Sequence, residues 1–159
     1  YHEAIQIEPG LVAPYINLAD LYRRLNRESE GEELLKTALE KYPDLAPIHY
    51  SLGLLKVRQN QQNVALDHLQ KAAELAPDNA YYSYVYAVGL NSNGKLAEAI
   101  AYLEEALKQH PYDQNILYTL TTLNEENGNR EAALRYARRL VNYYPGNSNF
   151  RQLLQMLGE

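Results

Sequence analysis

The sequence predicts an all-α fold, an α-solenoid of stacked antiparallel helix pairs, because three kinds of residue recur with one period of 34 residues. Proline follows an apolar helical pattern and ends the helix, since it lacks an N–H and its ring clashes with the preceding turn. Asparagine or glycine recurs where a tight turn needs the left-handed conformation. Small side chains recur where two helices would approach closely. The recurring residues are Pro9, Pro43, Pro77, Pro111 and Pro145, then Asn26, Asn60, Gly94 and Gly128, then Gly31, Ala65, Ala99 and Ala133.

The prolines divide the chain into four full repeats, which cover residues 12–45, 46–79, 80–113 and 114–147. In each repeat we expect one helix over roughly the first 14 residues and a second, antiparallel helix over roughly positions 18 to 31. Apolar residues recur at helical spacing within these segments, as Leu34, Leu35, Ala38 and Leu39 do in the first repeat. The sequence therefore predicts a single repeat domain built from helix pairs.

The two ends of the chain are expected to add one helix each. Residues 1–11 align with the second helix of a repeat, with Tyr1, Ala4 and Ile7 in its apolar columns, and so predict a partial repeat. Residues 148–159 match a first helix and predict a capping helix over the apolar edge of the fourth repeat. A start in the middle of a repeat indicates a piece of a longer array.

Composition and charge argue against several functional classes. No run of 18 apolar residues occurs, so we expect no membrane insertion. The net charge of −5 argues against nucleic acid as a partner, because phosphate binding needs clustered Lys and Arg. Cysteine is absent, and the four histidines never stand at the i, i+4 spacing of a helical metal site, so they are expected to be exposed or half-buried imidazoles. We therefore expect no enzyme activity, no cofactor and no metal.

The recurring columns resemble those of the tetratricopeptide-repeat family over the whole chain. The first repeat carries Tyr15, Leu18, Ala19, Tyr22, Gly31, Leu35, Ala38 and Pro43. Lys56 and Asn124 depart from the family pattern because they stand where Tyr is usual, and Ala137 stands where a large residue is usual. The pentatricopeptide family, which reads RNA, has a longer period and is basic, so it fits less well. The resemblance implies a right-handed superhelix that acts as a protein–protein interaction scaffold.

The resemblance also implies that positions 2, 5, 6, 9, 12 and 13 of each first helix face a concave groove. Position 5 reads Ile16, Tyr50, Tyr84 and Tyr118, so three tyrosines would form a ladder with a large contact area. The alternative is that these rings pack against the neighbouring helix and expose only their hydroxyl groups. The candidate partner-binding residues are Ile16, Asn17, Asp20, Arg24, Tyr50, Leu54, Arg58, Tyr81, Tyr84, Val85, Val88, Tyr118, Thr122 and Glu125.

Three functions are compatible with these residues. The first is a scaffold that binds an extended peptide or a partner protein, oriented by Arg24 and Arg58 at one end of the groove and Glu125 at the other. The second is a structural or oligomerisation module, including a homo-oligomer through the end helices. The third is an accessory arm of a larger bacterial enzyme, such as a haem-containing one. A chaperone C-terminus is disfavoured as a ligand, because the family's cationic clamp is replaced by Ile16, Asp20, Ser51, Tyr81 and Val85.

Overall fold

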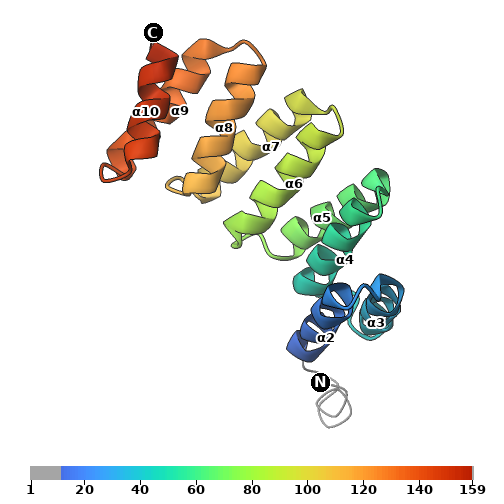
Figure 1. The fold of residues 1–159 in the computed structure, drawn as a ribbon. Coiled ribbons are helices and arrows are strands. Elements are labelled where there is room, and N and C mark those ends of the chain that lie inside the picture. The colour runs from blue at the N-terminus through green and yellow to red at the C-terminus, as the bar shows by residue number, and fades with distance from the viewer. Residues whose placement is uncertain (1–11, 159) are drawn as a thin grey trace. The chain divides into compact units, whose positions relative to one another are not determined.

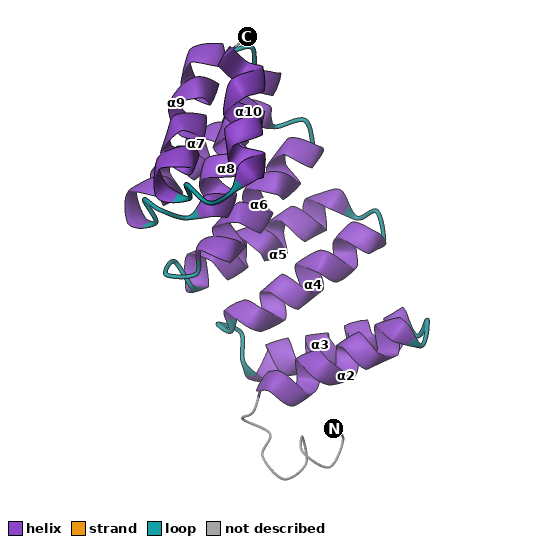
Figure 2. Ribbon diagram, turned by 60° about the vertical axis from the view of Figure 1, so that its left-hand side comes forward, coloured by secondary structure: helices purple, strands orange, loops and turns teal. Residues whose placement is uncertain are grey.

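The computed structural model describes residues 12–158, which form nine α-helices and no strand (Figure 1 and Figure 2). The partial repeat predicted over residues 1–11 lies outside this described range. The helices are α2 (Val12–Arg24), α3 (Glu28–Lys41), α4 (Ala46–Arg58), α5 (Gln62–Leu75), α6 (Ala80–Ser92), α7 (Leu96–Gln109), α8 (Gln114–Glu126), α9 (Arg130–Tyr143) and α10 (Ser148–Gly158).

The helix boundaries follow the predicted repeats. Each first helix begins at the first residue of a repeat, and each second helix begins one residue earlier than expected. Side-chain caps fix three of these starts, because Asn79, Asp113 and Asn129 accept hydrogen bonds from backbone N–H groups that the helix leaves unpaired. The prediction of an all-α helical-repeat fold is confirmed.

A residue in the left-handed conformation ends the first helix of every full repeat. The φ angle is 57° at Asn26 and Asn60, and 74° at Gly94 and Gly128. Glycine adopts this conformation without a steric penalty, and asparagine is among the few other residues that visit it routinely. The predicted turn column is therefore confirmed at all four positions.

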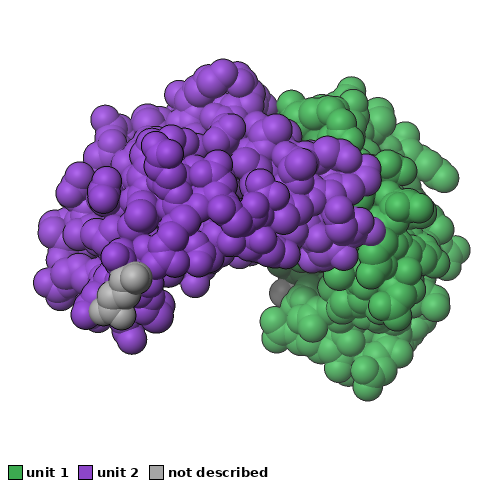
Figure 3. All heavy atoms as spheres, turned by 90° about the horizontal axis from the view of Figure 1, so that it is seen from above, with its two compact units in different colours: residues 1–76 green, residues 77–159 purple. Residues whose placement is uncertain are grey.

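The chain divides into two compact units, Tyr1–Ala76 (unit 1) and Pro77–Glu159 (unit 2), which Figure 3 shows in separate colours. In unit 1, α4 packs against α2, α3 and α5. In unit 2, α8 packs against α6, α7 and α9, and α10 packs against α9. Within each unit the first helices of successive repeats therefore touch, which is the contact pattern of stacked helix pairs.

Small side chains allow the paired helices to pack closely. Ala99 and Ala133 have no exposed surface, and Ala65 is 2% exposed. A Cβ atom added to Gly53 of α4 would lie 2.7 Å from Cδ2 of Leu69 on α5, which is closer than carbon atoms can approach without displacement. Glycine at this position therefore leaves room for the side chain of Leu69 against α4.

Helix α10 packs on α9 of the fourth repeat. Leu157 is buried against Ala133 and Ala137 of α9, and Leu153 and Leu154 pack around this cluster. The small side chain of Ala137, where the family usually has a large one, leaves room for α10 to pack closely on α9.

The two polar departures from the family pattern are both buried and both have partners. Asn124 is 2% exposed, and its Nδ2 donates a hydrogen bond to the Leu120 carbonyl at 2.8 Å. Lys56 is 7% exposed, and its Nζ donates to Oε1 of Glu32 at 2.7 Å and to Oε1 of Gln59 at 2.9 Å. A buried polar group is tolerated when such bonds replace those to water.

The hydroxyl group of Tyr15 is buried and has no hydrogen-bond partner within the described range. The side chain is 1% exposed and packs in one cluster with Leu35, Ile48 and Leu52. Replacing Tyr15 by Phe should raise the free energy of unfolding by about 1 kcal/mol, because a buried unpaired hydroxyl costs about 1–3 kcal/mol. Urea unfolding measures this change, and a loss of stability in the variant would contradict the assignment.

Candidate functional site

A cleft of about 410 Å³ lies in unit 1 between α2 and α4, the first helices of the first two full repeats. Helix α3 contributes Leu35, and every other lining residue comes from α2 or α4. The lining residues are Ile16, Asn17, Ala19, Asp20, Arg23, Leu35, Tyr50, Ser51, Leu54, Leu55 and Arg58.

The lining combines buried apolar groups with half-buried ones. Ala19, Leu35 and Leu55 are part of the hydrophobic core of unit 1 and are fixed by its packing. Tyr50 and Leu54 are only half-buried, so part of their apolar surface remains open to solvent. The cleft therefore offers a rigid apolar floor and two side chains that a partner could cover.

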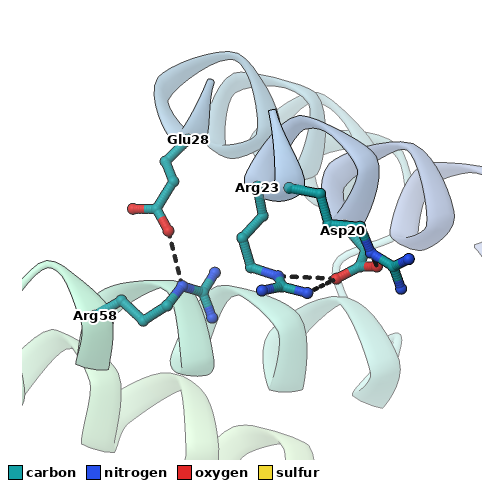
Figure 4. A network of polar contacts seen from close by, with 5 residues as sticks. Asp20, Arg23, Glu28 and Arg58 are labelled. Carbon is teal, nitrogen blue, oxygen red and sulfur yellow. Dashed lines mark hydrogen bonds and ion pairs between the residues drawn. The ribbon is translucent and has the colours of Figure 1, made fainter. Parts of the chain in front are cut away.

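Ion pairs involve the three arginines of this region (Figure 4). Arg23 donates to Oδ1 of Asp20 from Nε at 2.8 Å and from Nη2 at 2.6 Å, and Nε of Arg24 donates to Oδ2 at 2.8 Å. Nε of Arg58 on α4 donates to Oε1 of Glu28 on α3 at 2.8 Å. The bond from Arg23 lowers the pKa of Asp20, helped by the charges of both neighbouring arginines and opposed by burial.

Exposure limits what these ion pairs contribute to stability. The side chains of Arg23 and Asp20 are 41% and 40% exposed, and that of Arg24 is 70% exposed. Ion pairs of such exposure add little to the stability of a fold. Two guanidinium groups share one carboxylate at Asp20, so this part of α2 carries net positive charge.

Six of the predicted partner-binding residues line this cleft, namely Ile16, Asn17, Asp20, Tyr50, Leu54 and Arg58. Arg24 lies beside it, in a hollow lined by Asn17, Asp20 and Leu21. Arg23 and Ser51 also line the cleft but are not among the candidate residues. Their positions, 12 and 6 of their repeats, belong to the groove-facing set, so the repeat pattern contained the signal for both.

The candidates in unit 2 lie on α6 and α8. Tyr81 and Tyr118 are each 47% exposed, and Val88 is 39% exposed, whereas Tyr84 and Val85 are half-buried. Tyr81 and Tyr84 pack against each other, with ring centroids 5.7 Å apart. This face of α6 therefore combines aromatic and apolar surface.

The α8 candidates each have neighbours in unit 2. The ring of Tyr118 lies 6.3 Å from that of Phe150 on α10, yet nearly half of its surface stays exposed. Oγ1 of Thr122 donates to the Thr119 carbonyl at 3.0 Å, and Glu125 lies 3.8 Å from Arg130. The ladder that would join Tyr50 to the two tyrosines of unit 2 stays a prediction.

A contact between two histidines, His49 and His68, was not predicted from the sequence. His49 on α4 is buried, and its Nδ1 lies 3.1 Å from Nδ1 of His68 on α5. The two residues are 19 positions apart, so neither local spacing nor helical periodicity brings them together. Within the described range no group of three or more His, Cys, Asp or Glu side chains could hold a metal ion. None of the helices described above is long and apolar enough to cross a membrane.

Comparison with known proteins matches the repeats to one family. Family models of the tetratricopeptide repeat match residues 12–44, 50–114 and 90–157, which together cover the four full repeats except residues 45–49. None of the curated proteins compared by sequence matches the chain.

Solved structures share the fold at low sequence identity. YrrB, a TPR protein with an unusual peptide-binding site, has a TM-score of 0.73 and 21% identity over 98% of this chain and 80% of its own. MamA has a TM-score of 0.75 and 21% identity over 92% of this chain and 85% of its own. PilF of Pseudomonas aeruginosa has a TM-score of 0.74 and 20% identity over 91% of this chain and 66% of its own. With its helix pairs, its turn residues and its matched repeats, the chain belongs to the tetratricopeptide-repeat family.

Proposed function

We propose that the protein is a protein-interaction scaffold and that the cleft of unit 1 binds an extended peptide segment of a partner. The observation that supports this proposal best is the cleft itself, which is concave, has an apolar floor and lies between two first helices. Its volume of about 410 Å³ lies in the range of binding pockets, which spans roughly 300–1,000 Å³. Tetratricopeptide-repeat proteins are generally scaffolds without catalytic activity, and YrrB is one described as having a peptide-binding site.

The exposed side chains of the cleft suit a peptide with apolar and acidic residues. Tyr50 provides a large contact surface and loses little conformational entropy on binding, which is typical of binding hot spots. Arg58 uses only Nε in its bond to Glu28, so its two Nη groups can donate to a carboxylate or a backbone carbonyl of a partner. Apolar residues would cover Leu54 while an acidic residue meets the arginines.

Peptides selected for binding to the whole chain from a random display library test this proposal. We expect the selected peptides to lose about tenfold or more in affinity for a Tyr50→Ala/Leu54→Ala variant, because hot-spot residues contribute about 2 kcal/mol or more. Tyr112→Ala is the matched control, since Tyr112 is 62% exposed and lies outside the cleft in unit 2. Fluorescence polarisation gives the affinities, and circular dichroism verifies that both variants keep their helices.

Equal binding to the wild type and the cleft variant would contradict the proposal. A separate comparison tests the ladder of tyrosines. If a peptide also contacts unit 2, the triple variant Tyr50→Ala/Tyr84→Ala/Tyr118→Ala should bind it more weakly than Tyr50→Ala alone. Self-association through the end helices and attachment to a larger enzyme stay predictions.

A further inference from the structure

His49 and His68 form a direct contact between the two helices of the second full repeat, α4 and α5. Their Nδ1 atoms are 3.1 Å apart, and Nε2 of His49 lies 2.9 Å from the Pro43 carbonyl oxygen. Helix α4 also supplies Tyr50, Leu54 and Arg58 to the cleft, so this contact supports one wall of it.

The two imidazole rings point at each other through these nitrogens. Their ring centroids are 5.3 Å apart, close to the largest separation that an Nδ1–Nδ1 distance of 3.1 Å allows. Each Nδ1 therefore lies between the two ring centres, in the linear arrangement of a hydrogen bond. Two imidazoles that share a metal ion would instead converge on a point beside both rings.

The hydrogen-bond network assigns the protons of the neutral pair. A carbonyl oxygen can only accept, so Nε2 of His49 carries hydrogen and donates to Pro43. A neutral imidazole has one N–H, which leaves Nδ1 of His49 as an acceptor. His68 must then donate from its own Nδ1.

This network has room for one further proton but not for two. If His49 takes a proton, its Nδ1 becomes a donor, and His68 can accept on Nδ1 by moving its own hydrogen to Nε2. If both rings are protonated, two N–H groups and two positive charges face each other at 3.1 Å. The hydrogen bond is then lost, and like charges repel in a partly buried site.

The charged groups around the pair lie on α3, α4 and α5. Burial and the neighbouring His49 and Lys56 on α4 lower the pKa of His68, whereas Asp67 on α5 and Glu32 on α3 oppose the shift. Lys56 and Glu32 form an ion pair with each other, so most of their effect on His68 cancels. The surroundings therefore disfavour the protonated form of His68.

We propose that the His49–His68 pair makes the contact between α4 and α5 pH-sensitive, because it holds in its neutral and singly protonated forms and is broken by a second proton. In the unfolded chain both histidines take up a proton below about pH 6.5. The folded chain excludes one of these protons, so stability is full at pH 7 and falls as the pH drops below that value. Because the unfolded chain binds one proton that the folded chain excludes, the ratio of folded to unfolded protein falls about tenfold for each pH unit below about 6.

The third repeat has a pair of hydroxyl side chains at the positions that the two histidines occupy in the second repeat. Ser83 and Tyr102 occupy the same two positions of the third repeat, and their hydroxyl groups lie 3.3 Å apart. Serine and tyrosine are residue types that ordinarily carry no charge near neutral pH, unlike histidine. A His49→Ser/His68→Tyr variant therefore installs a neighbouring repeat's hydrogen bond in place of the histidine pair.

Urea unfolding of the whole chain between pH 7.5 and pH 5 tests the proposal. From pH 7 to pH 5 we expect the unfolding equilibrium constant of the wild type to increase about twentyfold more than that of the double variant. A His110→Gln variant is the matched control. His110 contacts the Pro77 carbonyl and takes no part in the contact between α4 and α5, so the stability of this variant should depend on pH as that of the wild type does. Equal pH dependence of the wild type and the double variant would overturn the proposal.

Nitrogen NMR of the wild type gives an independent test that does not require a variant to fold. We expect His49 with hydrogen on Nε2 and His68 with hydrogen on Nδ1 at pH 7.5. Two independent titrations near pH 6.5 in the folded state would contradict a shared proton. Stabilisation of the wild type, but not of the double variant, by added Zn²⁺ would also overturn it, because a bridging metal needs both Nδ1 lone pairs.

Discussion

Replacing Phe150 by alanine is expected to release α10 from unit 2. Phe150 is 8% exposed, and its ring lies 6.3 Å from that of Tyr118 and 5.9 Å from that of Tyr144. Truncating a buried Phe costs about 3–5 kcal/mol, and we expect about 3 kcal/mol because the ring keeps some exposure. Helix α10 has 11 residues, and a helix of this length is marginal in water without tertiary contacts.

Amide hydrogen exchange measures this effect where it occurs. A loss of about 3 kcal/mol corresponds to about a hundredfold faster exchange in α10 if the helix opens by itself. Met156→Ala is the matched control on the same helix, because Met156 is 57% exposed and should change exchange very little. Equal protection of α10 in both variants would show that Phe150 does not anchor the helix.

The Glu32→Gln substitution is expected to lower the free energy of unfolding by about 3 kcal/mol, because it leaves the charge of Lys56 buried without its counter-ion. The side chains of Lys56 and Glu32 are 9% and 15% exposed, and the ion pair joins α4 to α3. A second substitution, Lys56→Met, should restore most of the stability in the double variant, because it removes the buried charge itself. Glu30→Gln is the control two residues away, in an exposed pair with Arg27, and should change little.

The same ion pair predicts a loss of stability in acid. Burial alone would raise the pKa of Glu32, but hydrogen bonds from Lys36, Lys56 and Gln59 outweigh it and lower the pKa from 4.5 to about 2. The lowered pKa means that the stabilisation is complete above pH 4.5 and is lost as the pH falls towards about 2. Unfolding measured between pH 6 and pH 2 should show this loss in the wild type and not in Glu32→Gln. Parallel curves for the two proteins would contradict the assigned role of Glu32.

The repeat boundaries could be predicted because each depends on a local rule that recurs. Pro43 and Pro77 each follow a helix that cannot continue through a proline. The left-handed turn at Asn60 needs one of very few residue types. The expectation of a helix at the end of the chain rests on a similar local rule, since Phe150 and Leu157 keep helical apolar spacing. The second helices begin one residue earlier than this pattern predicted.

The polar contacts could not be predicted, because they depend on which faces of two helices meet. Lys56 and Glu32 are 24 residues apart, and only the packing of α4 on α3 brings them together. The same is true of His49 and His68, whose imidazoles appear unrelated in the sequence. For the candidate site, the groove-facing positions predicted most of the lining of the unit 1 cleft, whereas the shape of the cleft required the structure.

The constant position of the left-handed turn residue limits how a chain of this kind can change in length. Adding one residue inside a helix rotates every later side chain of that helix by about 100°, which would move buried leucines to the surface. An extra residue at the exposed turn near Gly94 or Gly128 avoids this rotation. Gain or loss of a complete block of 34 residues also preserves every helix face, because each block begins and ends with the same chemistry. Such proteins are therefore expected to lengthen by whole blocks, and to tolerate other insertions only between helices.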